Sequence, residues 1–338
     1  MPSSHRPTIS DVASLAGVSI ATVSRVINGS SQVAGQTIQR VQAAVTDLKY
    51  TPHAAARVLA SRKTNTIGLL LPEISGAFFQ PLLRGIEAGA QEAGFDLLIH
   101  TTDDTQSNAG IRRPLGEHNT DGLLVFTDSL DHKELRRLHS IGFPVVLLHQ
   151  APPKSLMIPV VTIENQSGAQ KIVEHLIVVH GCRRIVFLQG PEDHEDSVWR
   201  EKGYRQALKD HGITFNPSLV LRGGFNPDES RQALTRLLSN GKGFDSIFSG
   251  DDDSAIGVIQ ALRQAGWRVP EDVAVVGFDD SSFARTLDPP LTTVSAPTER
   301  VGREAVRQLV RIIRAEKVEP RLILPTELVI RQSCGCQA

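Results

Sequence analysis

The sequence predicts an all-α headpiece followed by an α/β body of two doubly wound lobes. Three observations support this prediction. The first 62 residues show small apolar side chains at helical spacing, whereas the later chain alternates short apolar runs with helical segments. At 338 residues the chain is long enough for two or three domains of ordinary size. We therefore expect a headpiece over residues 1–62 and a body over residues 63–338.

Charge is distributed unevenly between these two parts. The whole chain has a formal net charge of -1, with 22% charged and 40% hydrophobic residues, as in an ordinary globular protein. Residues 1–62 hold six Lys or Arg against two Asp, so the headpiece carries +4 and the remainder -5. A basic end on an acidic body favours a nucleic-acid contact at that end.

Residues 8–29, TISDVASLAGVSIATVSRVING, predict a helix-turn-helix. Thr8 and Asp11 have the spacing of a capping box with Asp in place of Glu. Gly17 tolerates the positive φ that ends a first helix, and Ser19 can cap a second one. Two short helices joined by a glycine turn form a helix-turn-helix. The alternative, a helical hairpin inside a core, would not need the polar outer face of the second helix.

That outer face carries short side chains and hydrogen-bond donors, which suit close approach to base edges and phosphates. These residues are Ile20, Ala21, Thr22, Ser24, Arg25 and Asn28. A third amphipathic helix fits Thr37 to Leu48, and Pro52 ends the headpiece. Ala54 to Ala60 fit two further helical turns, which are too short to be stable alone. We expect that segment to fold only when something holds it.

Short runs rich in Leu and β-branched residues, bounded by Gly, Pro or Asp, predict buried parallel strands in the body. They are TIGLLLP, GFDLLIHTTDD, DGLLVFTD, FPVVLLHQ, IPVVTIE, RRIVFLQG, FDSIFSGDD and DVAVVGFDD. Helical segments between them include Pro81 to Ala93, Gly168 to Val179, Glu201 to His211 and Ser254 to Ala265. About ten strand candidates are many for one open sheet, and residues 150–165 resemble a crossing. We therefore expect two similar lobes.

Residues directly after the predicted strands are the candidates for a binding site, because ligands of open α/β sheets bind outside the carboxyl ends of strands. The candidates found in this way are Phe78, Phe79, His149, Arg200, Asp251 and Asp279, and Phe225 would add a second aromatic face beside Phe78. Carboxylates and a guanidinium can bridge adjacent hydroxyls while an aromatic ring covers C–H surface, which is what a sugar needs. Asp252 and Asp280 each precede a helical segment, so helix capping is an equal alternative for them.

The run from Thr8 to Pro72 resembles the lac repressor and galactose repressor family of bacterial transcription regulators almost position for position, and the resemblance covers essentially the whole chain. It implies a body like that of the periplasmic sugar-binding proteins, in which the last helices and strands return to the first lobe. The two lobes would then be discontinuous in sequence.

The resemblance also assigns roles in the headpiece. It implies that Ala21, Thr22 and Arg25 read the major groove. Phosphate contacts are implied at Thr8, Ser24, Asn28 and Thr37. A hinge helix at about residues 54–60 would pair with its dimer mate in the minor groove, where Leu59, flanked by Ala56 and Arg57, opens a base step.

The function implied is that of a sequence-specific regulator, a repressor whose operator affinity a small, sugar-like effector changes, acting as a homodimer on a pseudo-palindromic operator. The alternatives are a ligand-activated or corepressor-dependent regulator, or a small-molecule-binding protein without DNA activity. The cleft also departs from the family pattern. His149 replaces the usual Asp, Asp251 the usual Asn, and Ser295 with Ala296 the usual Arg-Gln. The pocket is therefore no copy of a well-known sugar site.

Other classes of function lack a signal. No phosphate loop, nucleophile elbow or metal-ligand spacing stands out, so we expect neither an enzyme nor a cofactor. No run approaches the roughly 18 apolar residues of a membrane span, and a cytoplasmic protein without membrane contact is expected. Cys334 and Cys336 flank one glycine, but no histidine or further cysteine lies nearby in the sequence. We expect free thiols on a tail and no metal site.

Overall fold

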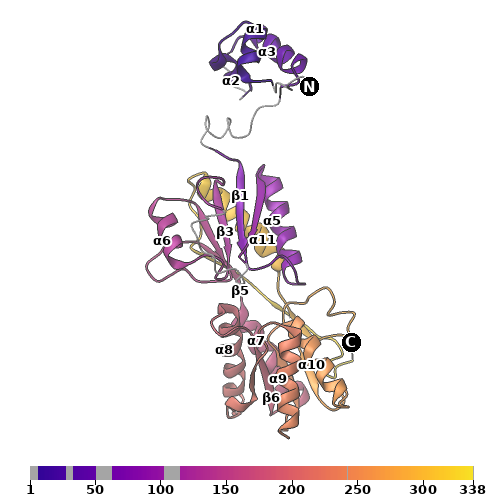
Figure 1. Ribbon diagram of the computed structural model, residues 1–338. Coiled ribbons are helices and arrows are strands. Elements are labelled where there is room, and N and C mark those ends of the chain that lie inside the picture. The colour runs from indigo at the N-terminus through magenta and orange to yellow at the C-terminus, as the bar shows by residue number, and fades with distance from the viewer. Residues whose placement is uncertain (1–6, 28–32, 51–62, 103–114, 242, 338) are drawn as a thin grey trace. The chain divides into compact units, whose positions relative to one another are not determined.

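The computed structural model describes residues 7–27, 33–50, 63–102, 115–241 and 243–337. The chain divides into two compact units, Met1–Thr64 and Asn65–Ala338. Each unit has its own buried apolar core, and Figure 1 names their elements.

The described headpiece consists of α1 (Ile9–Ala16), α2 (Ile20–Ile27) and α3 (Gly35–Asp47). Thr8 caps α1 through a reciprocal capping box with Asp11, and Gly17 ends the helix at a φ of 62°. The Ser19 Oγ accepts a hydrogen bond from the backbone N–H of Thr22 at 3.2 Å and so begins α2. These local signals confirm the predicted helix-turn-helix.

A small core holds the three helices together. Val12, Val23 and Val41 come from different helices, and each is completely buried. Arg40 on α3 donates to the backbone carbonyls of Ala16 and Gly17, which ties the third helix to the turn. No single described helix is long and apolar enough to span a membrane; α1 and α2 reach that length only as a pair bent by 102°.

The third helix begins at Gly35, two residues before the predicted start. The reason is that Ala34 is extended and its carbonyl already accepts from the N–H groups of Thr37 and Ile38 at 2.9 and 3.1 Å. Ile38 is half-buried, and the fully buried residues of α3 are Val41 and Ala44.

The first lobe of the body is built on a parallel six-stranded sheet in the order β11-β5-β4-β3-β1-β2. The strands are β1 (Thr66–Leu71), β2 (Asp96–Thr101), β3 (Gly122–Phe126), β4 (Val145–Leu148), β5 (Val160–Ile163) and β11 (Arg321–Leu324). Helices α5 (Phe79–Ala93) and α11 (Thr298–Ile313) share a core with one face of the sheet, and α6 (His132–Ser140) packs on the other. Figure 1 shows α5 and α6 on opposite sides.

The second lobe is built on a parallel four-stranded sheet in the order β7-β6-β8-β9. The strands are β6 (Ile185–Gln189), β7 (Val220–Arg222), β8 (Ser246–Ser249) and β9 (Ala274–Val276). The helices are α7 (Asn165–His180), α8 (Glu195–Asp210), α9 (Pro227–Ser239) and α10 (Asp252–Gln264), with a short η1 (Pro217–Leu219). An antiparallel pair, β10 (Thr293–Ser295) and β12 (Glu327–Val329), completes the described body.

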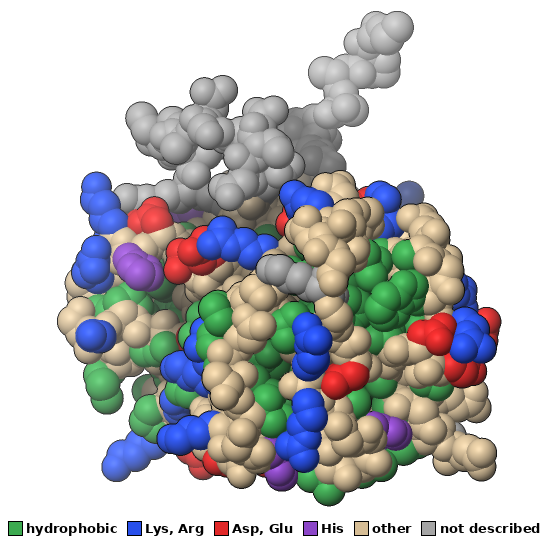
Figure 2. All heavy atoms as spheres, turned by 90° about the horizontal axis from the view of Figure 1, so that it is seen from below, with side chains coloured by type: hydrophobic (Ala, Val, Ile, Leu, Met, Phe, Trp, Pro, Cys, Tyr) green, Lys and Arg blue, Asp and Glu red, His purple; other side chains and the backbone are tan. Residues whose placement is uncertain are grey.

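The described chain passes between the lobes at three places, after β5, after β10 and after β11 (Figure 1). The last helix and β11 return to the first lobe, as the resemblance implied. The fold class of a helical headpiece with two doubly wound lobes is confirmed. Seen from below, the surface carries both basic and acidic side chains among apolar and uncharged ones (Figure 2).

Element boundaries depart from the predictions in two ways. The body helices begin earlier than predicted, and α8 begins at Glu195 rather than Glu201 because Glu195 and Asp196 form an acidic first turn that apolar spacing does not reveal. The β2 strand was expected to be buried. It lies at the edge of its sheet, where Leu98 and Ile99 are about two-fifths exposed.

The α5 and α11 helices are in backbone contact. A Cβ atom added at Gly85 would lie 1.9 Å from the carbonyl oxygen of Glu299, and one at Gly302 would lie 2.4 Å from that of Leu82. No side chain at either position fits without separating the helices. Close packing of this kind prevents α5 and α11 from sliding past each other.

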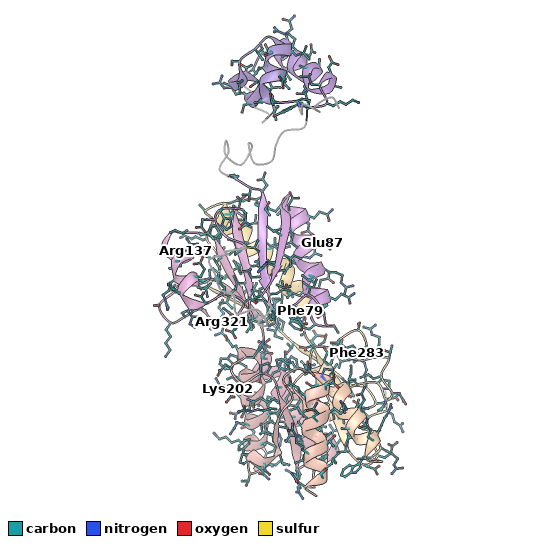
Figure 3. The ribbon with its side chains drawn as sticks, in the orientation of Figure 1. Phe79, Glu87, Arg137, Lys202, Phe283 and Arg321 are labelled. Atoms are coloured by element: carbon teal, nitrogen blue, oxygen red, sulfur yellow. The ribbon has the colours of Figure 1, made fainter. Side chains whose placement is uncertain are left out.

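We predict that Gly85→Ala destabilises the body by about 1–3 kcal/mol, because an extra methyl group overpacks the contact. Urea denaturation measures this change. The control is Glu87→Ala on the exposed face of the same helix (Figure 3), where we expect a change within about 0.5 kcal/mol. Equal stability of Gly85→Ala and the control would contradict the tight contact.

Candidate functional site

The outer face of α2 carries five of the eleven headpiece residues that the sequence assigns to DNA contact. Ile20 is half exposed although it is a large apolar residue, and Ala21 and Arg25 are also exposed. An exposed apolar side chain beside an exposed arginine suits a groove in which thymine methyl groups and guanine acceptors alternate. The described headpiece therefore presents a surface of the composition expected for base contacts.

The remaining residues assigned to DNA contact are half-buried, take part in helix caps or lie outside the described residues. Thr22, Ser24 and Thr37 are half-buried. The hydroxyl of Thr22 is 2.9 Å from that of Ser19, and the Thr8 hydroxyl donates to Asp11 at 2.7 Å, so both also serve helix caps. The predicted hinge helix lies outside the described residues, as do Asn28, Ala56, Arg57 and Leu59.

A cavity of about 220 Å³ lies between the two lobes of the body. It is bounded by residues that follow the carboxyl ends of strands in both sheets. The first lobe contributes Pro72, Glu73, Gly76, Phe78, Phe79 and Phe126, and the second contributes Pro191, His194, Asp196, Arg200, Gly224, Phe225, Asp251, Asp253 and Asp279. Phe79 lies at the end of the first lobe that faces the second (Figure 3).

Arg200 on α8 is the buried cation of this cavity, with only 2% of its surface exposed. Its Nε donates to the Asn165 side-chain oxygen at 2.9 Å, Nη1 to the Gly250 carbonyl at 2.6 Å, and Nη2 to Asp279 at 3.0 Å. The guanidinium carbon also lies 3.8 Å from the ring centre of Phe278. These contacts fix the plane of the guanidinium before any ligand arrives.

Asp279 follows β9 and completes this arrangement. Its φ is 110°, a conformation that residues with side chains rarely adopt. The backbone N–H of Asp279 donates to the Val294 carbonyl at 2.8 Å, which holds the strained residue against the β10 strand. Strain maintained by surrounding structure is typical of binding sites, because it aims a side chain.

His149 and Asp196 join the two lobes. The His149 Nδ1 lies 2.7 Å from one oxygen of Asp196, and the Asn165 amide donates to the other at 2.7 Å. Burial opposes ionisation of Asp196, but the charges of His149 and Arg200 outweigh it, so its pKa lies below the ordinary value. The His149 ring also packs at 5.6 Å from that of Phe78. The hydrogen-bonded pair of His149 and Asp196 therefore connects the two lobes at the back of the cleft.

Acidic residues gather at the start of α10. Burial, together with the charge of Asp279, raises the pKa of Asp251 to about 7. The same two causes raise the pKa of Asp253 to about 6. Asp252 is structural, since it accepts from Thr293 Oγ1 at 2.6 Å and from the Ser281 N–H at 2.7 Å. The cavity is therefore rich in acceptors.

A helix-turn-helix unit in one chain with a two-lobed, ligand-sized cleft defines a DNA-binding transcriptional regulator with a receptor body. Comparison with known proteins agrees. Residues 8–53 match the family described as bacterial regulatory proteins, lacI family, and residues 173–334 match the periplasmic binding protein-like domain. The chain belongs to the lacI family.

Individual relatives resemble the chain over nearly its whole length. It is 37% identical to the HTH-type transcriptional regulator CelR of Thermobifida fusca, over 97% of this chain and 98% of that protein. It is 34% identical to catabolite control protein A of Priestia megaterium, over 96% and 98%. The lac repressor dimer bound to operator and the anti-inducer ONPF has a TM-score of 0.85 at 26% identity, over 98% and 99%. A CelR-cellobiose complex has a TM-score of 0.72 at 35% identity, over 97% and 100%.

The structure brings six of the seven sequence-assigned cleft residues to the cavity wall and leaves His149 behind it. Helix capping belongs to Asp251, whose side chain accepts from the Ser254 N–H at 3.0 Å, and not to Asp252, which is the first helical residue. Asp280 precedes no helix and pairs with Arg331 at 2.6 Å. The alternative of helix capping was thus wrong for both residues. At Asp252 the helix begins one residue earlier than that alternative required, and after Asp280 no helix begins.

Sequence reasoning missed several residues of the cleft. Asn165 directly follows the predicted strand IPVVTIE, so the rule used for the other candidates would have found it. Asp196 stands four residues before Arg200, a spacing that places both on one helix face. That signal was hidden because the helix was predicted to begin after both residues. No sequence signal marks Phe126 or His194.

We predict that Asp251→Asn flattens the pH dependence of stability between about pH 4 and 7. Folded Asp251 keeps its proton to about pH 7, whereas an unfolded Asp loses it near pH 4, so its contribution to stability falls as pH rises through this window. Asn retains the helix cap. At pH 8 the free energy of unfolding of the variant should exceed that of the wild type by about 1–3 kcal/mol, as measured by urea denaturation.

The control for this experiment is Asp272→Asn. Hydrogen bonds from Arg268 lower the pKa of Asp272 to about 2, so above about pH 5 this carboxyl has lost its proton in both the folded and the unfolded state. The control should leave the slope between about pH 5 and 8 as in the wild type. An unchanged slope for Asp251→Asn as well would contradict the raised pKa.

Proposed function

We propose that this chain is a repressor that binds a pseudo-palindromic operator as a homodimer, and that a sugar-like effector in the interlobe cavity changes its operator affinity. The observation that carries the effector proposal is the fixed pair of Arg200 and Asp279 on an acceptor-rich wall. The proposal also places the protein in the cytoplasm, with no catalytic role.

The chemistry of the cavity supports a neutral, hydroxyl-rich ligand. Asp251, Asp253 and Asp279 offer acceptors for hydroxyl donors, and Arg200 is the one Lys or Arg among the described residues that line the cavity. An anionic ligand would add to the repulsion that already raises the pKa of these carboxyl groups. The rings of Phe78 and Phe225 supply the apolar surface that the C–H face of a sugar requires.

Two similar proteins carry sugars. The CelR structure is a cellobiose complex, and a LacI family regulator from Enterococcus faecium contains bound ribose, with a TM-score of 0.71 and 25% identity to this chain. These two sugars are therefore sensible first probes. A thermal-shift series with each one measures binding directly, because a ligand that binds only the folded state raises its midpoint.

The DNA-binding part of the proposal rests on the headpiece. One recognition helix covers only a few base pairs, so affinity and specificity require two half-sites and a two-fold symmetric dimer. We infer that Ala21, Thr22 and Arg25 face base edges. The hinge segment, with Leu59 as its wedge, would provide the minor-groove contact.

Coupling between cleft and operator would use the angle between the lobes. We infer that the ligand contacts Arg200 and Asp279 in both states and gains contacts with Phe78 when the cleft closes. A ligand shifts such an equilibrium only through its different affinities for the two states, and typical couplings are about 1–3 kcal/mol. The hinge segment would be the element that this change of angle orders or releases.

We predict that Arg25→Ala reduces discrimination between operator and random DNA by about 1–3 kcal/mol, because a bidentate contact to guanine is lost. Fluorescence anisotropy with operator and scrambled duplexes measures both affinities. Binding to the scrambled duplex should change much less, since phosphate contacts supply it. A uniform loss on both duplexes would assign Arg25 to the DNA backbone instead.

A second prediction concerns the cleft. Arg200→Ala and Asp279→Asn should leave operator affinity without ligand close to that of the wild type, and should abolish the change caused by the sugar that the thermal series identifies. Operator affinity with and without that sugar measures this. Arg268→Ala, an exposed arginine of the same lobe, is the control and should respond fully.

Two outcomes would count against this assignment. Loss of ligand-free operator binding in a folded variant would show that these residues support operator binding without an effector, and a full response would place the effector elsewhere. The sign of the wild-type response decides between mechanisms: weaker operator binding with sugar indicates a repressor released by its effector, and tighter binding indicates a corepressor.

A further inference from the structure

Four side chains that bind transition metals meet on the second lobe. His175 and His180 come from the last part of α7, and Cys334 and Cys336 come from the segment after β12. One ligand atom from each residue lies within 4.8 Å of all the others. The expectation of cysteines without a neighbouring histidine was wrong, because folding brings together residues 156 and 161 positions apart.

The distances between these atoms fit a tetrahedron. The two histidine Nε2 atoms are 3.2 Å apart. The Cys336 Sγ lies 3.6 Å from Nε2 of His175 and 3.5 Å from Nε2 of His180. A tetrahedral zinc ion with Zn–N of about 2.0–2.1 Å and Zn–S of about 2.3 Å requires N···N edges of about 3.3 Å and S···N edges of about 3.6 Å. Three edges of the tetrahedron are already present.

The surrounding backbone holds the cysteines in place. The Ser333 hydroxyl donates to the Val275 carbonyl at 2.6 Å, which fixes the segment beside β9. Gly335 has a φ of 101°, a conformation that suits glycine and lets both neighbouring cysteines point to one place. The Thr292 hydroxyl lies 3.1 Å from the Cys334 sulfur, as an outer partner that can donate to a thiolate. Cys334 itself is buried, so these residues are not a loose tail.

We propose that His175, His180, Cys334 and Cys336 bind one Zn²⁺ ion per chain. Two thiolates and two imidazoles are ligands that select zinc over magnesium or calcium. Four protein ligands fill the tetrahedral shell, so the site is structural and has no open position for a substrate. Binding releases the two thiol protons to solvent and leaves the zinc with its ligands neutral.

The ion would fasten the last described segment of the chain to α7. Both elements follow crossings between the lobes: α7 comes directly after the crossing that follows β5, and the cysteine segment comes after β12, which the chain reaches from the crossing that follows β11. The site shares no residue with the cavity. A zinc assay therefore tests this proposal separately from the proposed effector and operator.

Metal content tests the proposal on the full-length protein. The chelated and reduced protein is incubated with Zn²⁺, freed of excess by gel filtration and assayed for bound metal. We expect one zinc per chain and a raised melting temperature, with no effect of Mg²⁺. Substitution with Co²⁺ should give the visible bands of a tetrahedral site together with sulfur-to-cobalt charge transfer.

Variants locate the ligands. Cys336→Ser and His180→Asn should weaken zinc binding by more than the roughly 10–100-fold that loss of an outer partner costs. Both side chains are partly exposed, so folding should survive. Matched controls are Cys182→Ala and His132→Asn, a cysteine and a histidine outside the cluster, and they should bind one zinc as the wild type does.

Three results would overturn the proposal: no zinc retained by the reduced wild type, equal retention by Cys336→Ser, or a cobalt spectrum without charge transfer from sulfur. A Cys334–Cys336 disulfide that persists under reduction and excludes zinc would also overturn it, and would assign the pair to redox chemistry instead.

Discussion

The buried guanidinium of Arg200 is the interaction on which the second lobe and its cleft depend. A buried cation is tolerated only when it is paired and its donors are satisfied. Here the partners are Asn165 at the start of α7, Gly250 directly after β8 and Asp279 three residues after β9, so one side chain determines how three segments meet. The strained backbone of Asp279 and the buried Asn165 are consequences of that requirement.

The same arrangement explains why the cleft has excess acceptor capacity. Arg200 directs its donors to protein oxygens, and only one Asp279 oxygen is engaged by it. Asp251 and Asp253 then stand in the same wall with raised pKa values, because burial and Asp279 both oppose their ionisation. A ligand whose hydroxyl groups donate hydrogen bonds to these carboxylates offsets the cost of their burial and mutual repulsion, whereas a further anion would increase that cost. Specificity of this kind follows from the cost of unpaired buried groups.

Helices within each lobe are closely packed, so a change in the angle between the lobes is expected at the crossings between them. Besides Gly85 and Gly302 in the first lobe, Gly257 on α10 faces the Pro227 carbonyl, and Gly203 on α8 faces that of Gln166; a Cβ would meet them at 1.9 and 2.3 Å. Helices in backbone contact cannot slide without separating, so each lobe should respond as a unit. The hydrogen-bonded pair of His149 and Asp196 joins the lobes near these crossings. Its two partners come from opposite lobes, which makes it sensitive to the angle between them.

The sequence by itself determined the helix-turn-helix and the alternation of strands and helices. Its signals act within a few residues: the Thr8 cap reaches Asp11, and Gly17 turns the chain locally. Only the tertiary structure decided that His149 leaves the cavity wall to meet Asp196, because its partner is 47 residues away. It likewise decided that Cys336 meets His175 across 161 residues. Local backbone preferences carry no information over such separations; they are set by how sheets and helices pack, and that packing depends on the whole chain at once.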